Sequence, residues 1–255
     1  MERRGPGADD SRVISFVIPA HNEQHLLGAT LAALDVAARS CGEPFEILVV
    51  DDSSNDRTAA IAAANGARVL HVTHRQISAT RNSGGRAARG EFLVFVDADT
   101  RVHAAVLAAA LVALRGGAVG GGCNVRFDGR LAAWALVAEP VFTHLQRATR
   151  FAAGCFLFCT REAFEAIGGF DESVYAGEEV LMSRALHRRG RFVLLRETVW
   201  TSGRKLREHS GWELLRFVGL VARRGRGAVE SRDGLDIWYG PRRDDPEPGE
   251  GRRAA

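Results

Sequence analysis

The sequence predicts an α/β fold with a mostly parallel sheet and helices on both of its faces. Four apolar runs, rich in β-branched and aromatic residues, have the length of strands buried on both faces. They cover residues 13–18, 45–50, 67–72 and 91–96. Segments with apolar residues at helical spacing alternate with these runs, and they cover residues 23–40, 56–66 and 77–90. A repeated strand–helix–strand order favours right-handed crossovers, which connect parallel strands.

The second half of the chain is less regular, and we expect it to form a smaller subregion that builds the other wall of a cleft. Apolar spacing predicts helices over residues 102–117, 161–170, 178–190 and 201–227. Short apolar runs predict strands over residues 118–127, 154–160, 191–195 and 197–202. The two ends of the chain, residues 1–12 and 241–255, are poor in apolar residues and are predicted to be disordered. A single domain over residues 13–240 remains.

The composition is that of an ordinary soluble globular protein. Of 255 residues, 46% are hydrophobic and 25% are charged, and the formal net charge of +3 does not require nucleic acid as a partner. No apolar run approaches the roughly 20 residues of a membrane-spanning helix. The first residues lack the apolar core of a secretion signal, and the four cysteines lack zinc-ligand spacing and are expected to be reduced. We therefore expect a cytoplasmic protein.

Basic residues concentrate between Arg184 and Arg226. This bias suits an anionic substrate or a membrane surface. Residues 201–227 contain the apolar side chains of Trp212, Leu215, Phe217, Leu220 and Val221 among these basic residues. Two interpretations of this segment stay open: an interfacial helix at the inner face of a membrane, and a helix packed on the domain with its charges in solvent.

Acid-bearing segments follow three of the predicted strands. They are "PAHNE" at 19–23, "DDSSND" at 51–56 and "DADT" at 97–100. Ligands of open parallel sheets bind at the carboxyl ends of the strands. The three segments are therefore predicted to share one polar cleft.

The pair Asp97 and Asp99 allows three interpretations. Two carboxylates at this spacing can bind a divalent cation, and a cation that bridges two phosphates neutralises a diphosphate leaving group. The pair can also belong to an ordinary turn in which one Asp caps the next helix. Finally, the stretch resembles the opening motif of haloacid-dehalogenase-like phosphatases, with Asp97 as nucleophile and Asp99 as general acid. That family carries the motif on its first strand, whereas three strands precede it here.

The segment after the second strand, "VVDDSSNDRT", combines a binding and a capping signal. We expect Asp52 to face a ligand, and Ser53, Ser54 or Asn55 to cap the following helix. Neither G-x-G-x-x-G nor G-x-x-x-x-G-K-[ST] occurs near these strands. Their absence argues against a dinucleotide-binding dehydrogenase and a P-loop NTPase.

Five segments in order resemble the family 2 glycosyltransferases, which have the GT-A fold. "FVIPAHNE", "EILVVDDSSNDRT" and "ISATRNSGGRAARGEFLVFVDADT" are similar to the nucleotide-sugar-binding half of that family. "GCFLFCTREAFEAIGGFDES" and "GEEVLMSRALHRRGRF" are similar to its acceptor half. The resemblance implies a GT-A-like, Rossmann-related domain with a nucleotide-sugar-binding half over residues 13–100 and an acceptor half over residues 101–240.

The resemblance also implies which residues bind the nucleotide sugar. They are Pro19, Ala20, Asn22, Glu23, Asp52, Arg81, Asp97, Ala98, Asp99 and Gly154. Asp52 would lie beside the base, and Arg81 near the base or the diphosphate. Gly154 would pass close to the sugar, where a side chain would intrude. Arg204 is added from its charge, because an arginine there could reach the donor diphosphate or an anionic acceptor.

The metal and the catalytic base follow from the same resemblance. Asp99 would be the direct ligand of Mg²⁺ or Mn²⁺, and Asp97 would contact the ribose or a metal-bound water. The family usually has Glu-Asp at the start of the helix over 178–190, with the second acid as the base. This chain has Glu178 and Glu179 there, so the base role falls to Glu179, with Glu178 left open. The helix dipole is expected to favour the ionised form of either acid.

The sequence thus predicts a metal-dependent glycosyltransferase that inverts the anomeric carbon. The donor would be a UDP- or GDP-linked sugar, and the acceptor a hydroxyl group, with lipid-linked and polysaccharide acceptors both open. Two alternatives remain. One is a haloacid-dehalogenase-like phosphohydrolase that uses Asp97 and Asp99, and the other is a non-catalytic nucleotide-sugar-binding protein.

Overall fold

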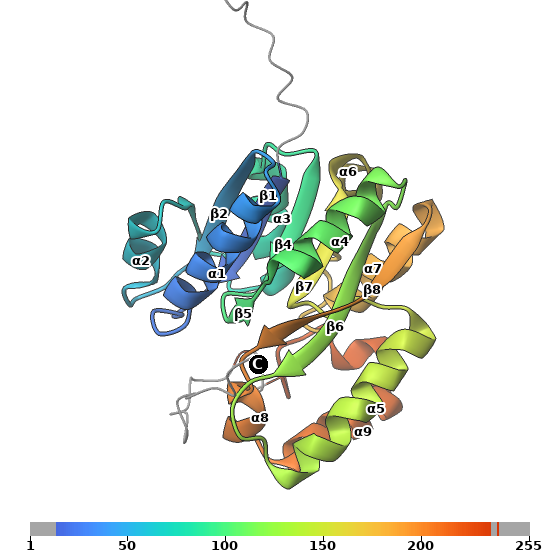
Figure 1. Cartoon of the computed structure of the whole chain (residues 1–255). Coiled ribbons are helices and arrows are strands. Elements are labelled where there is room, and N and C mark those ends of the chain that lie inside the picture. The colour runs from blue at the N-terminus through green and yellow to red at the C-terminus, as the bar shows by residue number, and fades with distance from the viewer. Residues whose placement is uncertain (1–13, 236–238, 240–255) are drawn as a thin grey trace, which may run out of the picture.

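The computed structural model describes residues 14–235 and 239. In this part of the chain, eight strands form one sheet in the order β3-β2-β1-β4-β7-β6-β8-β5, with helices on both faces (Figure 1). The strands are β1 (Ile14–Ala20), β2 (Phe45–Asp52), β3 (Arg68–Val72), β4 (Phe92–Val96), β5 (Thr100–Arg101), β6 (Gly120–Phe127), β7 (Phe156–Thr160) and β8 (Phe192–Thr201). The helices are α1 (Leu27–Ser40), α2 (Thr58–Ala64), α3 (Ile77–Ala87), α4 (Ala104–Arg115), α5 (Ala133–Thr149), α6 (Arg161–Ile167), α7 (Glu178–Arg189), α8 (Arg204–Glu208) and α9 (Gly211–Arg224), followed by the 3₁₀ helix η2 (Gly225–Ala228).

The first four strands make the parallel part of the sheet. Strand β1 pairs in parallel with β2 and with β4, and β2 pairs in parallel with β3. Strand β7 then enters antiparallel to β4, β6 is antiparallel to β7, and β8 is parallel to β6. The predicted fold class, a mostly parallel sheet covered by helices on both sides, is confirmed.

Alternation along the central strand divides the core into two layers. In β1, Phe16 and Ile18 belong to one buried cluster, which also contains the leucines of α1 and α4. Val17 belongs to the second cluster, which contains apolar residues of α6 and α7. Because successive side chains of a strand point to opposite faces, a continuous apolar run is what a strand covered on both sides requires.

The first helix begins four residues later than the sequence predicts. The backbone N–H of Asn22 donates to Ser54 Oγ (3.0 Å), and the N–H of Glu23 donates to Thr58 Oγ1 (2.8 Å). These bonds hold residues 21–26 as a loop against the segment that follows β2, and α1 starts only at Leu27.

Three further differences lie in the second half of the chain. The strands predicted over 191–195 and 197–202 are the single strand β8, whose pairing with β6 shifts register between Gly122 and Asn124. The helix predicted over 201–227 is divided into α8 and α9, because Ser210 and Glu213 form a capping box that starts α9 anew. Helix α5 was not predicted at all, and it contains Pro140 within its span.

The domain boundaries stay predictions. Residues 1–12 and 241–255, which the sequence predicts to be disordered, lie outside the described residues. The division near residue 100 coincides with the change from the parallel to the mixed part of the sheet, and one continuous sheet contains strands from both sides of it.

Two consecutive glycines let α3 lie close to the sheet. A Cβ on Gly84 would clash with Val17 and would lie 2.7 Å from Val50 Cγ2, and a Cβ on Gly85 would lie 2.5 Å from the ring of Phe164. The missing side chains therefore set the distance between α3 and the strands that carry the polar loops.

We expect Gly84→Ala to lower the free energy of unfolding by about 1–3 kcal/mol, because the added methyl overpacks the α3–sheet contact. The matched control is Gly28→Ala in α1, where a Cβ would lie 3.7 Å from Ile61 Cγ2, an ordinary contact. That change should be neutral or stabilising by less than about 1 kcal/mol. Urea unfolding of both variants measures the difference, and equal stabilities would contradict the close packing of α3.

Candidate functional site

A cleft lies where the loops after β1, β2 and β4 meet, at the carboxyl ends of the parallel strands. Its volume is about 440 Å³. Eight of the residues predicted to bind a nucleotide sugar line it: Pro19, Ala20, Asn22, Glu23, Asp52, Asp97, Ala98 and Asp99. Arg81, Gly154 and Arg204 are not part of this lining, and neither are Glu178 and Glu179.

The rest of the lining consists of residues that were not among the predicted donor-binding residues, although three of them lie in the segments predicted to share the cleft. These residues are His21, Ser53, Asn55, Arg75, Gln76, Ile77, Thr80, Lys205, Glu208, His209 and Tyr239. The stretch from Arg75 to Ile77 follows β3, so the rule that ligands sit beyond strand ends could have found it. Lys205, Glu208 and His209 lie far along the sequence, and only the tertiary structure brings α8 to the cleft.

The loops after β1 and β2 are joined by their own polar groups. Asn22 Oδ1 accepts a hydrogen bond from the backbone N–H of Asn55 (2.9 Å), and the N–H of Asn22 is bound by Ser54. Asn22 has a φ of 54°, a left-handed conformation that Asn tolerates better than most residues. Asn22 therefore fixes the relative position of the two loops in addition to lining the cleft.

The carboxylate of Asp52 accepts hydrogen bonds from the segment that leads into α3. Its Oδ1 accepts from the backbone N–H of Arg75 (2.8 Å), and its Oδ2 accepts from Thr80 Oγ1 (2.7 Å) and from the N–H of Gln76 (3.2 Å). The side chain is buried. In this arrangement Asp52 positions the start of α3, and the surfaces of Arg75 and Gln76 that it holds become part of the cleft wall.

The capping residue of α2 differs from the prediction. The sequence indicates Ser53, Ser54 or Asn55, yet the helix begins later, at Thr58. Asp56 Oδ1 accepts from the Thr58 backbone N–H (2.9 Å) instead. The serines and Asn55 are left to join the two loops and line the cleft.

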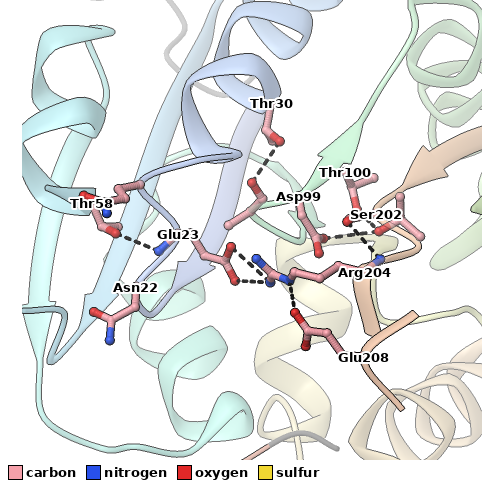
Figure 2. A network of polar contacts seen from close by, with 12 residues as sticks. Asn22, Glu23, Thr30, Thr58, Asp99, Thr100, Ser202, Arg204 and Glu208 are labelled. Atoms are coloured by element: carbon pink, nitrogen blue, oxygen red, sulfur yellow. Dashed lines mark hydrogen bonds and ion pairs between the residues drawn. The ribbon is translucent and has the colours of Figure 1, made fainter. Parts of the chain in front are cut away.

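The loop that carries Asp97 and Asp99, called the D-x-D loop below, is held in place from three sides, and Figure 2 shows the contact from Thr30. Thr30 Oγ1 of α1 donates to the carbonyl of Ala98 (2.9 Å), and the Asp97 N–H donates to the carbonyl of Cys155 (3.3 Å). Asp99 Oδ1 accepts from Thr201 Oγ1 at the end of β8 (3.2 Å). Because it is anchored on α1, on the residue before β7 and on the end of β8, the loop presents the two carboxylates at a defined place in the cleft.

Negative charge accumulates around Asp99. Burial, followed by the nearby carboxylates of Glu23 and Asp97, raises the pKa of Asp99 to about 6. Lys205 and Arg204 act in the opposite direction. The carboxylates are therefore not fully compensated by the protein's own cations.

The donor set suits a hard divalent cation that takes further ligands from a substrate. The carboxylates of Asp97 and Asp99 supply the oxygen atoms that Mg²⁺ and Mn²⁺ prefer. Within residues 14–235 and 239, no group of three or more His, Cys, Asp or Glu side chains is assembled to hold a metal ion. A cation here would relieve the charge accumulation at Asp99 and would need phosphate oxygens or water to complete its coordination.

Arg204 lies behind this carboxylate cluster (Figure 2). Its Nη2 is 3.2 Å from Glu23 Oε1 and 3.3 Å from Oε2, and its Nε is 3.6 Å from Glu208 Oε1. Burial alone would lower the pKa of Arg204, but the carboxylates of Glu23, Asp99 and Glu208 raise it. Arg204 is thus a fixed positive charge beside the D-x-D loop, whereas its neighbour Lys205 reaches the cleft surface.

Arg81 is the most deeply buried charged side chain of the site. Its Nη1 donates to Glu178 Oε1 (2.6 Å), and its Nη2 donates to Asp97 Oδ1 (2.8 Å). Only 1% of the residue is exposed, so it lies beneath the cleft rather than in it. Although burial opposes the charge, the Asp97 and Glu178 carboxylates raise the pKa of Arg81. Arg81 joins the D-x-D loop to the start of α7.

The lack of a side chain at Gly154 leaves room for the guanidinium of Arg81. Arg81 Nη2 donates to the Gly154 carbonyl (2.9 Å), and a Cβ on Gly154 would lie 3.0 Å from the same nitrogen. The sequence predicts that a side chain here would intrude on a sugar. In the structure the group it would crowd is the guanidinium that holds Asp97.

The two acids at the start of α7 have different surroundings. Glu178 is buried and bound by Arg81, whereas Glu179 is half-buried and forms no ion pair with an arginine of the described residues. Burial, then the charge of Glu178, raises the pKa of Glu179 to about 8, and its own backbone N–H and the Arg81 charge lower it. The expectation that the helix dipole would keep Glu179 ionised is therefore wrong, since desolvation and the neighbouring acid outweigh it.

The chain matches a family model, that of glycosyl transferase family 2, over residues 15–168. This is more than half of its length. The chain belongs to glycosyl transferase family 2. Strands β1, β2 and β4, the D-x-D loop, α3 and Gly154 all fall inside the matched segment, whereas α7 with its two acids lies beyond it.

Curated proteins with similar sequences are also glycosyltransferases. Over 99 residues the chain is 35% identical to an undecaprenyl-phosphate 4-deoxy-4-formamido-L-arabinose transferase of Pectobacterium atrosepticum. The aligned stretch covers 36% of this chain and 30% of that enzyme, so the chain matches less than a third of its relative.

Solved structures confirm the GT-A-like fold of this family 2 chain. A mannosyltransferase of Pyrobaculum calidifontis, solved with GDP-Man and Mn²⁺, has a TM-score of 0.64 at 19% identity, over 81% of this chain and 60% of that one. Glucosyl-3-phosphoglycerate synthase of Mycobacterium tuberculosis, solved with Mn²⁺, UDP and glucosyl-3-phosphoglycerate, has a TM-score of 0.57 at 20% identity, over 98% and 88% of the two chains.

Two smaller predictions can also be compared with the structure. All four cysteines are free thiols, and Cys123, Cys155 and Cys159 are buried. Among the helices of the described residues, none has both the length and the apolar character needed to cross a bilayer.

We expect Arg81→Met to lower the free energy of unfolding by about 3–5 kcal/mol at neutral pH, because it leaves the buried Glu178 and the half-buried Asp97 without their cation. Adding Glu178→Gln to this variant should restore part of the loss. The control is Arg39→Met, which removes an exposed ion pair with Asp35 and should cost less than about 1 kcal/mol. Urea unfolding measures all three. A loss for Arg81→Met as small as the control's would contradict the structural role of Arg81.

Proposed function

We propose that this chain transfers a sugar from a nucleoside-diphosphate sugar to a hydroxyl acceptor, with a divalent cation and with inversion of the anomeric carbon. The observation that carries the proposal is the cleft at the strand ends, where the carboxylates of Asp97 and Asp99 meet a wall of polar loop residues. Membership of glycosyl transferase family 2 supports it. A bound nucleotide also accounts for the position of the cleft at the edge of a parallel sheet.

The nucleoside would occupy the part of the cleft built by the loops after β1, β2 and β3. Pro19, Asn22 and the segment held by Asp52 offer short polar side chains and backbone groups there. Such groups suit a uridine or a guanosine nucleotide. Among the similar structures, one contains GDP-Man and another contains UDP, which is consistent with either donor class.

The diphosphate would lie against the D-x-D loop. Asp99, with Asp97, would hold Mg²⁺ or Mn²⁺, and the ion, when bound, would neutralise negative charge on the leaving diphosphate. Lys205 lines the cleft and adds a mobile positive charge on the same side. Arg204 forms an ion pair with Glu23, so it would add positive electrostatic potential near the diphosphate without contacting it.

Glu179 is the residue that we assign as the base. In a single displacement, Glu179 takes the proton of the acceptor hydroxyl while that oxygen bonds to the anomeric carbon and the bond to the diphosphate oxygen breaks. Burial and Glu178 make Glu179 a stronger base than an ordinary carboxylate. Glu178 is held by Arg81, so it serves to position α7 and to raise the pKa of its neighbour.

The two alternatives are less well supported. A haloacid-dehalogenase-like phosphohydrolase needs Asp97 as a nucleophile, but Asp97 Oδ1 is bound by Arg81, and the family match is to glycosyl transferases. A non-catalytic nucleotide-sugar-binding protein would not require a half-buried acid of raised pKa in α7.

We expect calorimetric titration to show binding of UDP or GDP that depends on Mn²⁺. Asp99→Asn keeps the shape of the side chain and removes its charge, so it should weaken the metal-dependent binding at least about tenfold. The control is Asp35→Asn, on the exposed face of α1, which should bind as the unchanged chain does. If a folded chain binds neither nucleotide with or without the metal, the transferase proposal fails.

We expect the rate of sugar transfer to rise as the pH increases through about 8. The raised pKa of Glu179 means that the carboxyl is largely protonated at neutral pH and can accept a proton only after it ionises. Glu179→Gln should lower kcat by roughly 10²-fold or more and remove this rise, with little change in nucleotide binding.

The matched variant for this experiment is Glu178→Gln. It should reduce kcat through misplacement of α7 but keep a pH-dependent rise, displaced to lower pH because one neighbouring charge is gone. The opposite result, in which Glu178→Gln abolishes the rise and Glu179→Gln retains it, would move the base role to Glu178.

A further inference from the structure

Exposed apolar side chains gather on α5 and α9. The large hydrophobic residues that are exposed in the described part of the chain are Val36, Val112, Leu136, Val141, Leu145 and Trp212. Four of these six lie on the two helices, and Trp212 is the most exposed of all, at 76%. Single exposed hydrophobics need no explanation, but a concentration on neighbouring elements does.

The two helices lie together at one end of the molecule (Figure 1). A Cβ on Gly211, the first residue of α9, would lie 3.2 Å from the ring of Trp134 in α5, so the helices are in contact where α9 begins. Helix α8, whose Lys205 lines the cleft, comes directly before α9 in the chain. The exposed surface of α5 and α9 is therefore close in the chain to a helix that lines the cleft.

The exposed face of α9 combines an aromatic ring with positive charge. Trp212, Arg216 and Arg223 are exposed, and their spacing of four and seven residues places them on one side of the helix. Acidic side chains do not balance this face. In α9, Glu213 closes the capping box with Ser210, and in α5, Glu139 lines a pocket toward β6 together with Arg126 and Arg147.

We propose that the surface formed by these side chains binds an anionic lipid bilayer. We call it the α5–α9 face, and its residues are Val141, Leu145, Trp212, Arg216 and Arg223. Leu136 is not part of it, because it faces the opposite side of α5, toward β6. Charge complementarity decides the occupant, since exposed arginines around a tryptophan match a negatively charged lipid surface, whereas a second copy of this face would bring like charges together. The idea that this surface presents a lipid-linked acceptor to the cleft rests on the proposed function. The proposed binding to a bilayer is independent of that function.

The arginines and the tryptophan of the α5–α9 face determine how strongly it should bind an anionic membrane. Each arginine near an anionic membrane surface strengthens binding roughly fivefold, and this contribution falls as salt screens the charges. Trp212 adds an amphipathic ring of the kind that sits at the level of lipid headgroups. Binding should therefore need both anionic lipid and the tryptophan.

The experiment is sedimentation of the full chain with vesicles. One vesicle contains phosphatidylglycerol and phosphatidylcholine in equal parts, and the other contains phosphatidylcholine alone. We expect binding to the anionic vesicle only, weakened by added salt. Arg216→Gln with Arg223→Gln should reduce it roughly 25-fold, and Trp212→Ala should reduce it severalfold.

The matched control is Arg188→Gln with Arg189→Gln at the end of α7. These arginines are also exposed, and their replacement removes the same amount of charge elsewhere on the molecule. The control pair should bind vesicles as the unchanged chain does. An equal loss in both pairs would mean that overall charge, not the α5–α9 face, drives binding, and would overturn the proposal.

Two other results would also overturn it. One is an absence of binding to anionic vesicles. The other is a dimer in sedimentation analysis that Trp212→Ala dissociates, with no vesicle binding, because the face would then be an interface between copies. Nucleotide titration of the same variants should be unchanged, so a failure of the membrane proposal can be told apart from a failure of the proposed function.

Discussion

The burial of one arginine is the constraint on which the site depends. Arg81 can lie inside the protein only because Asp97, Glu178 and the Gly154 carbonyl bind its two terminal nitrogens. These partners come from the D-x-D loop, from α7 and from the loop before β7. An unpaired buried charge is very costly, so the three segments must meet in one arrangement. The carboxylates that would serve the donor and the acceptor are thereby placed relative to one another.

The neighbouring charges then determine the ion pairing and the pKa of each acid. Asp97 is neutralised on one oxygen by Arg81, whereas Asp99 faces Glu23 and Asp97 and has a raised pKa. Glu179 stands beside Glu178 without an arginine of its own, and its pKa is raised further. Acids of the same kind thus differ in pKa according to their burial and the charges beside them.

Much of the fold and part of the site could be predicted from local patterns. The strands β1, β2 and β4 are apolar runs of strand length, and their polar ends must share one edge in a parallel sheet, which is why Asp52, Asp97 and Asp99 were found. Helix α5 was missed because Pro140 lies inside it, and a proline usually ends or kinks a helix. The division between α8 and α9 was missed because a capping box at Ser210 interrupts a segment whose spacing is helical throughout.

The sequence by itself determined the family, the sheet and the loops that carry acids, because these depend on periodicity and on short segments in order. Only the tertiary structure decided what each side chain does. Arg81, Gly154 and Arg204, which were predicted to bind the donor, are absent from the lining of the cleft; Arg81 and Arg204 bind carboxylates, and Gly154 makes room for a guanidinium. The two glutamates that open α7 are equivalent in sequence and differ in which one Arg81 reaches. Burial and charge at a site are sums over residues distant in the chain, and no local pattern contains them.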